Sequence, residues 1–235
     1  MHNVAIPDYA LARAKVRKGG KLHAFDTIDP SRTALLVIDL QNGFLAPGQS
    51  AEIGPAREIV PNVNRLANAL RDTGGSVVWL RHTITPESEK KWPLWLSSFG
   101  AGEWSERTRQ AFAPGSHGHE LYQGLIVEPD DLVIDKFCFS AFIHGSSNLD
   151  KTLRGRGIDT VLITGTATNV CCESTARDAM MMNYKVHFVS DATACRTDEE
   201  HNATLAILTV MFADVRSTDE IIQLLHRATG LIETK

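Results

Sequence analysis

Short apolar runs alternate with segments of helical periodicity along most of this 235-residue chain. The first run, Thr33 to Asp39, is almost continuously apolar, which is typical of a strand buried on both faces of a parallel sheet. The segment from Asn62 to Asp72 instead places apolar residues at i, i+3, i+4 and i+7, beginning at Val63. This spacing predicts an amphipathic helix, which the glycine at Gly74 ends.

The same alternation continues to the end of the chain and predicts its fold class. Further strands are expected over Ser76–Arg81, Asp131–Lys136, Thr160–Thr164, Tyr184–Ser190 and Asp214–Ser217. Further helices are expected over Ser147–Arg154, Ser174–Asn183, Asp198–Phe212 and Thr218–Ala228. The repeated order of strand and helix predicts a three-layer, doubly wound α/β fold, with helices on both faces of a six-stranded, mostly parallel sheet.

Two segments fall outside this alternation. Residues 1–30 are predicted to form an N-terminal arm, whose basic stretch Arg13–Lys21 is solvated or, as the alternative, contacts another subunit. Residues 31–235 are then a single domain. Within it, Thr83 to Gly124 is rich in tryptophan and shows no clear period, which is typical of a lid, a binding loop or an oligomer contact.

Composition narrows the class of protein. Apolar residues make up 43% of the chain and the formal net charge is −4, so the chain should fold and should not bind nucleic acid. No secretory signal and no membrane-spanning apolar run is present, which predicts a cytoplasmic protein without a membrane partner. Four cysteines at no zinc-like spacing predict reduced thiols.

Three residues at the ends of predicted strands could carry chemistry. Cys171 lies between the strand Thr160–Thr164 and the predicted helix Ser174–Asn183, at the helix start, where the helix dipole favours the nucleophilic thiolate. Asp39 and Lys136 end two other strands, and ligands of doubly wound sheets bind beyond the carboxyl ends of strands. Asp39 could accept the thiol proton, and Lys136 could lower the pKa of the thiol.

Each of these residues also has a structural interpretation. Cys171 could be an ordinary buried thiol, although its neighbour Cys172 suits that role better. Asp39 could cap the turn that follows it, and Lys136 could be solvated. The adjacent pair Cys171 and Cys172 could also act as a thiol-redox sensor without catalysis.

Three motifs in order resemble the isochorismatase-like cysteine hydrolase superfamily over roughly residues 30 to 225. They are Leu36–Phe44 (LVIDLQNGF), Lys136 followed by Ser140–Phe142 (SAF), and Gly165–Ala179 (GTATNVCCESTARDA). The resemblance implies that Asp39, Lys136 and Cys171 form a catalytic triad. It also implies a cis peptide between Thr166 and Ala167, and an oxyanion hole formed by the backbone N–H groups of Ala167 and Cys171.

The resemblance also sorts the possible reactions. Members that cleave a vinyl ether lack the cysteine, and nicotinamidase-type members hold a metal through an Asp-x-His motif that is missing around His82. We therefore expect no metal and no cofactor. The cysteine motif is most similar to that of ureidoacrylate amidohydrolases, so we expect cleavage of the C–N bond of a small amide or ureido compound through a thioester.

Several finer expectations accompany this interpretation. Vinyl-ether hydrolysis and nicotinamidase-like deamidation are the alternative reactions. Family members are usually dimers or tetramers, so a homodimer or homotetramer is expected. Residues that could line the substrate pocket, with core packing or turn formation as the alternative, are Gln41, Phe44, Trp79, Phe142 and Asn169.

Overall fold

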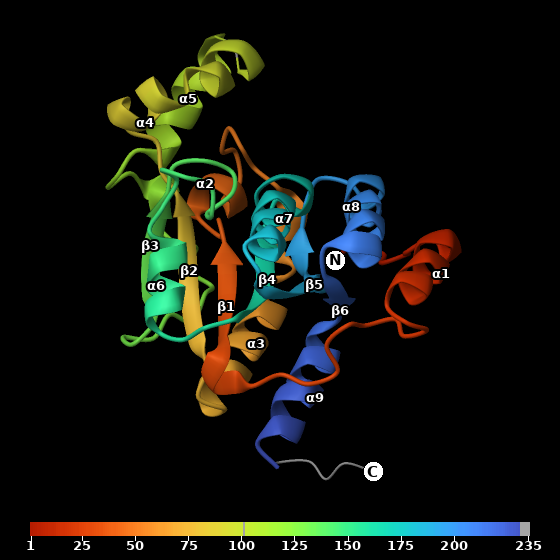
Figure 1. Cartoon of the computed structure of the whole chain (residues 1–235). Helices are drawn as coiled ribbons and strands as arrows, with labels where there is room; N and C mark the ends of the chain where they lie inside the picture. Colours follow the sequence, from red (N-terminus) through yellow and green to blue (C-terminus); the bar gives the residue numbers. More distant parts are fainter. Residues whose placement is uncertain (101, 231–235) are drawn as a thin grey trace.

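A six-stranded, all-parallel sheet forms the centre of the computed structural model, which describes residues 1–100 and 102–230 (Figure 1). The strand order β3-β2-β1-β4-β5-β6 confirms the predicted doubly wound α/β fold. The winding changes direction between β1 and β4. The strands are β1 (Thr33–Ile38), β2 (Ser76–His82), β3 (Leu132–Lys136), β4 (Thr160–Thr166), β5 (Lys185–Ala194) and β6 (Asp214–Arg216).

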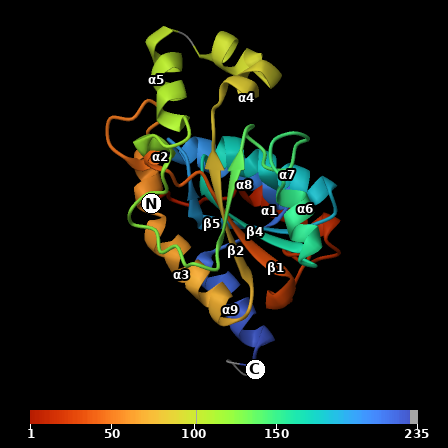
Figure 2. The same ribbon diagram turned by 90° about the vertical axis from the view of Figure 1, so that its left-hand side faces the viewer.

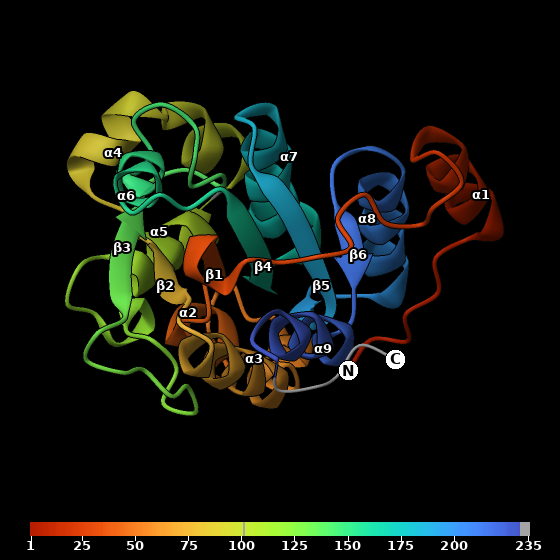
Figure 3. The same cartoon turned by 60° about the horizontal axis from the view of Figure 1, so that its bottom comes forward.

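Helices cover both faces of the sheet. One face packs against α3 (Val60–Asp72) and α9 (Thr218–Ala228), and the other against α6 (Leu149–Gly155), α7 (Glu173–Met181) and α8 (Asp198–Met211) (Figure 3). Alternate β1 residues enter the two cores, since Leu36 belongs to one cluster and Leu35 to the other. This two-sided burial explains why the strands are apolar throughout.

The N-terminal arm contains a helix that its sequence pattern did not predict. Helix α1 (Asp8–Arg17) packs against α8 and buries only two small residues, Ala10 and Ala14, so its apolar stripe is too weak to be recognised. Just after α1, Lys18 forms an ion pair with the buried carboxylate of Asp214 at 2.8 Å. Part of the basic stretch is therefore packed on the domain and is not a solvated arm.

The tryptophan-rich segment is also more regular than its sequence suggests. It contains α4 (Pro86–Lys91), the π-helical turn η3 (Trp95–Phe99), α5 (Gly102–Phe112) and the short 3₁₀ turn η4 (His117–His119). Figure 2 shows α4 and α5 rising beyond the end of the sheet. The buried side of α5 consists of Ser105, Thr108 and Phe112. Because two of these residues are polar, the sequence shows no apolar residues at helical spacing.

Shorter elements complete the chain and connect the larger ones. They are η1 (Pro30–Arg32), α2 (Asn42–Leu45), η2 (Gly54–Arg57) and the π-helical turn η5 (Thr168–Cys172), which leads directly into α7. Among the residues that the structure describes, no helix combines the length and apolar character needed to cross a membrane.

One glycine controls how closely the two central strands approach. Gly165 of β4 lies beside Ile38 of β1 and has a φ of +109°, a conformation that favours glycine. A Cβ atom at this position would overlap the backbone carbonyl of Ile38. Since Asp39 and the turn η5 follow these strand ends, this close approach brings the two segments together.

We predict that Gly165→Ala lowers the free energy of unfolding by more than about 2 kcal/mol, because it adds overlap with rigid backbone to the unfavourable φ. Gly157→Ala is the matched control, since Gly157 also has a positive φ, of +72°, but faces open space. The control substitution should lower the free energy of unfolding by about 1 kcal/mol. Urea unfolding of both variants tests this, and equal losses would contradict the role assigned to Gly165.

Candidate active site

Three side chains from separate strands meet at the carboxyl edge of the sheet. Asp39 follows β1, Lys136 is the last residue of β3, and Cys171 lies in η5 after β4. Lys136 Nζ is 2.9 Å from Asp39 Oδ2, and both side chains are 0% exposed. The Cys171 thiol adjoins both charges and its residue is 4% exposed. The structure therefore brings together the three residues that the sequence analysis predicted as candidate site residues.

Burial and mutual attraction shift the pKa values of both members of the ion pair. Burial raises the pKa of Asp39 above its ordinary value, and attraction to Lys136 opposes this rise only in part. Burial lowers the pKa of Lys136, but attraction to Asp39 and Cys171 outweighs it, so the net pKa is raised. Asp39 is thus a stronger base than an exposed carboxylate, beside a lysine that keeps its charge.

The same burial keeps Cys171 protonated. Loss of water and the adjacent Asp39 carboxylate raise the pKa of the thiol, while Lys136 acts in the opposite direction. This corrects our expectation of a resting thiolate at a helix start, because desolvation outweighs the nearby lysine here. The thiol must therefore lose its proton to a base during any attack.

The backbone around these side chains is also specialised. Asp39 adopts a left-handed conformation with a φ of +56°, and its N–H donates to the carbonyl of Leu80 at 2.9 Å. Aspartate tolerates this conformation better than most residues. On the other strand, the Thr166–Ala167 peptide is cis, and the N–H of Cys172 donates to the carbonyl of Ala167 at 3.1 Å. Unusual backbone conformations therefore occur at the adjoining ends of β1 and β4.

A cavity of about 300 Å³ opens onto Cys171. Phenylalanine and tryptophan side chains form part of its wall, and they come from the tryptophan-rich segment and from the loops after β1 and β3. The aromatic residues are Phe44, Trp95, Trp104, Phe112 and Phe139. Ala167 and Cys171 line the same space, and two exposed side chains of opposite charge, Arg196 and Glu200, also belong to the lining. The cavity is thus suited to a small, mostly apolar molecule.

The five expected pocket residues fall in different places. Phe44 and Asn169 line the cavity. Gln41 lies outside its lining, where its amide accepts from the N–H of His82 at 2.7 Å and donates to the carbonyl of the same residue at 3.1 Å. Trp79 and Phe142 are core residues: the Trp79 indole donates to Asp131 at 2.8 Å, and Phe142 packs on Tyr184. Neither faces the cavity, because each points into a helix-covered layer.

Several further residues line the cavity. Trp95, Trp104 and Phe112 belong to the tryptophan-rich segment and Phe139 follows Lys136, two places that the sequence indicated could shape a pocket, whereas His82 and Arg196 were not expected there. The clustering of aromatic residues after β2 and β3 was a signal that these segments shape a pocket. No periodicity, however, could show which of the rings turn inward.

Beside the cavity, His2, Cys195 and His201 place potential metal-ligand atoms within 4.8 Å of one another. The two imidazole rings are stacked, with centroids 4.4 Å apart and planes 17° apart, so their in-plane lone pairs do not converge. His2 is also engaged at both nitrogens, with Asp198 at 2.7 Å and with the N–H of Cys195 at 3.1 Å. In this arrangement the group attaches the first residues of the chain to the cavity wall.

Comparisons with known proteins agree with this geometry. A family model described as the isochorismatase domain matches residues 33–220. The ureidoacrylate amidohydrolase RutB of Methylobacterium radiotolerans is 32% identical over 198 residues, which cover 79% of this chain and 76% of the relative.

Solved structures show the same likeness. The crystal structure of a cysteine hydrolase from Pseudomonas syringae pv. phaseolicola 1448A has a TM-score of 0.73 at 28% identity, covering 86% of this chain and 95% of that chain. N-carbamoylsarcosine amidase from Thermoplasma acidophilum has a TM-score of 0.65 at 26% identity, covering 80% and 97%. Since the family model spans all six strands of the sheet, the chain belongs to the isochorismatase-like hydrolase family.

Proposed function

We propose that the protein is a cysteine-dependent amidohydrolase that cleaves the C–N bond of a small amide or ureido compound. The observation that carries this proposal is the buried thiol of Cys171, which lies beside the Asp39–Lys136 ion pair and lines a cavity with several aromatic side chains. Relatives with this fold include a ureidoacrylate amidohydrolase and an N-carbamoylsarcosine amidase. A buried thiol with its own base is the arrangement that attack on an amide carbonyl requires.

The reaction begins when Cys171 attacks the carbonyl carbon and Asp39 takes the thiol proton. The carbonyl oxygen becomes an oxyanion, which the N–H groups of Ala167 and Cys171 stabilise; such donors are typically worth a few kcal/mol each. Asp39 then returns the proton to the nitrogen, and the C–N bond breaks. An amine or ammonia leaves, and a thioester joins the acyl group to Cys171.

Water completes the reaction by attacking the thioester while Asp39 again accepts a proton. The C–S bond breaks, the acid is released and the thiol takes the proton back. With a carbamoyl substrate the released acid is carbamate, which decomposes to carbon dioxide and ammonia. Lys136 stays charged throughout and offsets the negative charge that moves between Asp39, the thiolate and the oxyanion.

Two alternatives are less consistent with the site. A redox-sensor role needs exposed thiols of low pKa, but burial raises the pKa of both Cys171 and Cys172. Vinyl-ether hydrolysis needs no cysteine nucleophile and gives Cys171 no function. The cytoplasmic location, the homodimer or homotetramer, the absence of a metal and the division into an arm and one domain remain predictions.

We predict that Cys171→Ala abolishes ammonia release from a panel of small amides and ureido compounds, with a loss of at least about 1,000-fold. Cys172→Ala is the matched control. Cys172 is equally buried, but its thiol contacts the carbonyl of Thr164 within the core, so activity should stay within about 10-fold. If both variants release ammonia like the wild type, Cys171 is not the nucleophile.

The raised pKa of Asp39 also predicts how kcat/KM depends on pH. Asp39 must be ionised to accept the thiol proton, and burial raises its pKa above the ordinary 3.8, so kcat/KM should fall on the acid side at a pH above 3.8. Steady-state rates from pH 4 to 8 measure this limb.

Circular dichroism at each pH controls for unfolding. The fold itself should weaken in acid, because burial lowers the pKa of His201 to about 4 and the unfolded chain binds the proton first. A rate that stays constant down to pH 4 in the folded protein would contradict the role of Asp39.

A further inference from the structure

His82 is a buried polar side chain that the mechanism above does not use. It is the last residue of β2, is 1% exposed and lines the same cavity as Cys171. Its ring meets Trp95 edge-on at 5.0 Å and Phe112 at 5.5 Å. These aromatic contacts hold the imidazole in one orientation but offer it no conventional hydrogen bond.

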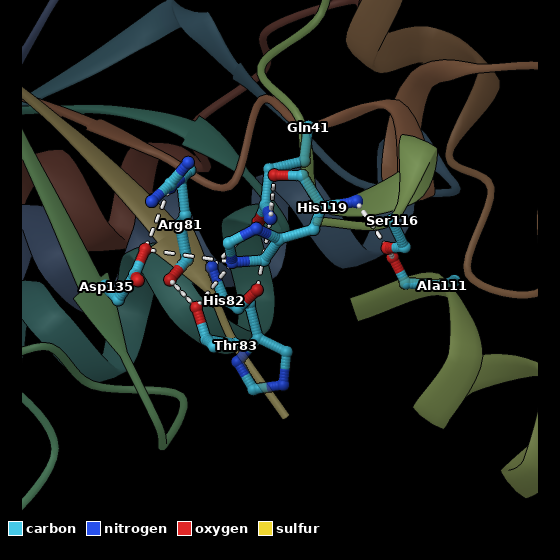
Figure 4. A network of polar contacts seen from close by, with 8 residues as sticks. All are labelled: Gln41, Arg81, His82, Thr83, Ala111, Ser116, His119 and Asp135. Carbon is cyan, nitrogen blue, oxygen red and sulfur yellow. Dashed lines mark hydrogen bonds and ion pairs between the residues drawn. The ribbon is translucent and has the colours of Figure 1, made fainter. Parts of the chain in front are cut away.

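The backbone of His82, in contrast, is held firmly. The Gln41 amide bonds both its N–H and its carbonyl, and also donates to the carbonyl of His119 at 2.9 Å. Figure 4 shows the His82 ring projecting away from this network, with no dashed line reaching it. Across residues 1–100 and 102–230, neither ring nitrogen has a hydrogen-bond partner. The strand end is thus fixed while the side chain remains unpaired.

The ring is also uncharged. Burial lowers the pKa of His82 well below 6.5, and the neighbouring Lys136 and His119 add to this effect. A neutral imidazole has one N–H donor and one lone-pair acceptor. Leaving such groups unpaired in an apolar site is unfavourable, and a bound molecule that pairs with them recovers this free energy.

We propose that His82 orients the substrate by hydrogen bonding to a neutral polar group beside the scissile carbonyl, such as the second nitrogen of a ureido group. The inference rests on the proposed amidohydrolase function and narrows its substrate class. A charged group is disfavoured at this position, because the surrounding aromatic rings cannot replace the hydration of a charge. Ureido compounds are therefore preferred over amides that carry a methylene group in place of the second N–H.

Butylurea and hexanamide form a suitable pair of probes, since they differ only by NH in place of CH₂ next to the carbonyl. The ratio of their kcat/KM values in the wild type, divided by that ratio in a variant, cancels their different chemical reactivity. For His82→Phe, which keeps the aromatic packing, we expect this quotient to be about 10 to 100. His82→Gln retains a neutral donor and acceptor and should restore part of the preference.

Phe112→Leu is the matched control. Phe112 packs against His82 and lines the cavity but has no polar atom, so this variant should change both rates and leave their ratio within about 3-fold. Thermal unfolding establishes that each variant is folded. If His82→Phe turns over both probes with an unchanged ratio, the inference is overturned while the amidohydrolase function stands.

A binding experiment separates the inference from the catalytic proposal. In the Cys171→Ala protein, which should not turn over substrate, the imidazole ¹⁵N resonances of His82 are followed as butylurea or hexanamide is added. We expect butylurea to shift them and to bind more tightly than hexanamide. Equal binding of both probes, or no shift with butylurea, would overturn the role of His82 whatever the outcome of the activity measurements.

Discussion

The structure depends on one buried ion pair, between Asp39 and Lys136. Neither side chain is exposed, so both charges lose their hydration. The fold offsets this loss by holding Lys136 Nζ at 2.9 Å from Asp39 Oδ2. The parallel sheet makes this possible, because β1 and β3 end at the same edge with β2 between them. A parallel arrangement is therefore a requirement of the site as well as of the core. Removal of one partner would leave an uncompensated charge in the centre of the domain.

Burial of this pair also affects the protonation of Asp39 and of the neighbouring Cys171. Cys171 is a thiol at rest, because desolvation and the nearby carboxylate outweigh the attraction of Lys136. Asp39 is a stronger base for the same reason. In the proposed mechanism, Asp39 therefore deprotonates the thiol only during attack, so no thiolate is present beforehand to be oxidised. This coupling suits a hydrolase better than a redox sensor.

The aromatic cavity adds what the sheet edge cannot supply. Trp95 and Phe112 come from the segment between β2 and β3, which rises beyond the end of the sheet (Figure 2), and both line the cavity that opens onto Cys171. In such surroundings a single unpaired polar group has a large effect on which molecule binds. His82 is that group: a strand residue with its backbone fixed by Gln41 and its ring left for a ligand.

From the amino-acid pattern alone, the layers of the fold and the three side chains that meet at the candidate site could be predicted. Continuous apolar runs identify buried parallel strands, and Asp39, Lys136 and Cys171 mark the ends at which such strands place a site. Helices α1 and α5 were not recognisable, since their buried sides consist of alanines or of serine and threonine. The folded arrangement was needed to show that Trp79 and Phe142 belong to the cores while His82 lines the cavity. It alone also set the protonation of Cys171, because the direction of a side chain and the loss of its water depend on neighbours that are distant in the chain.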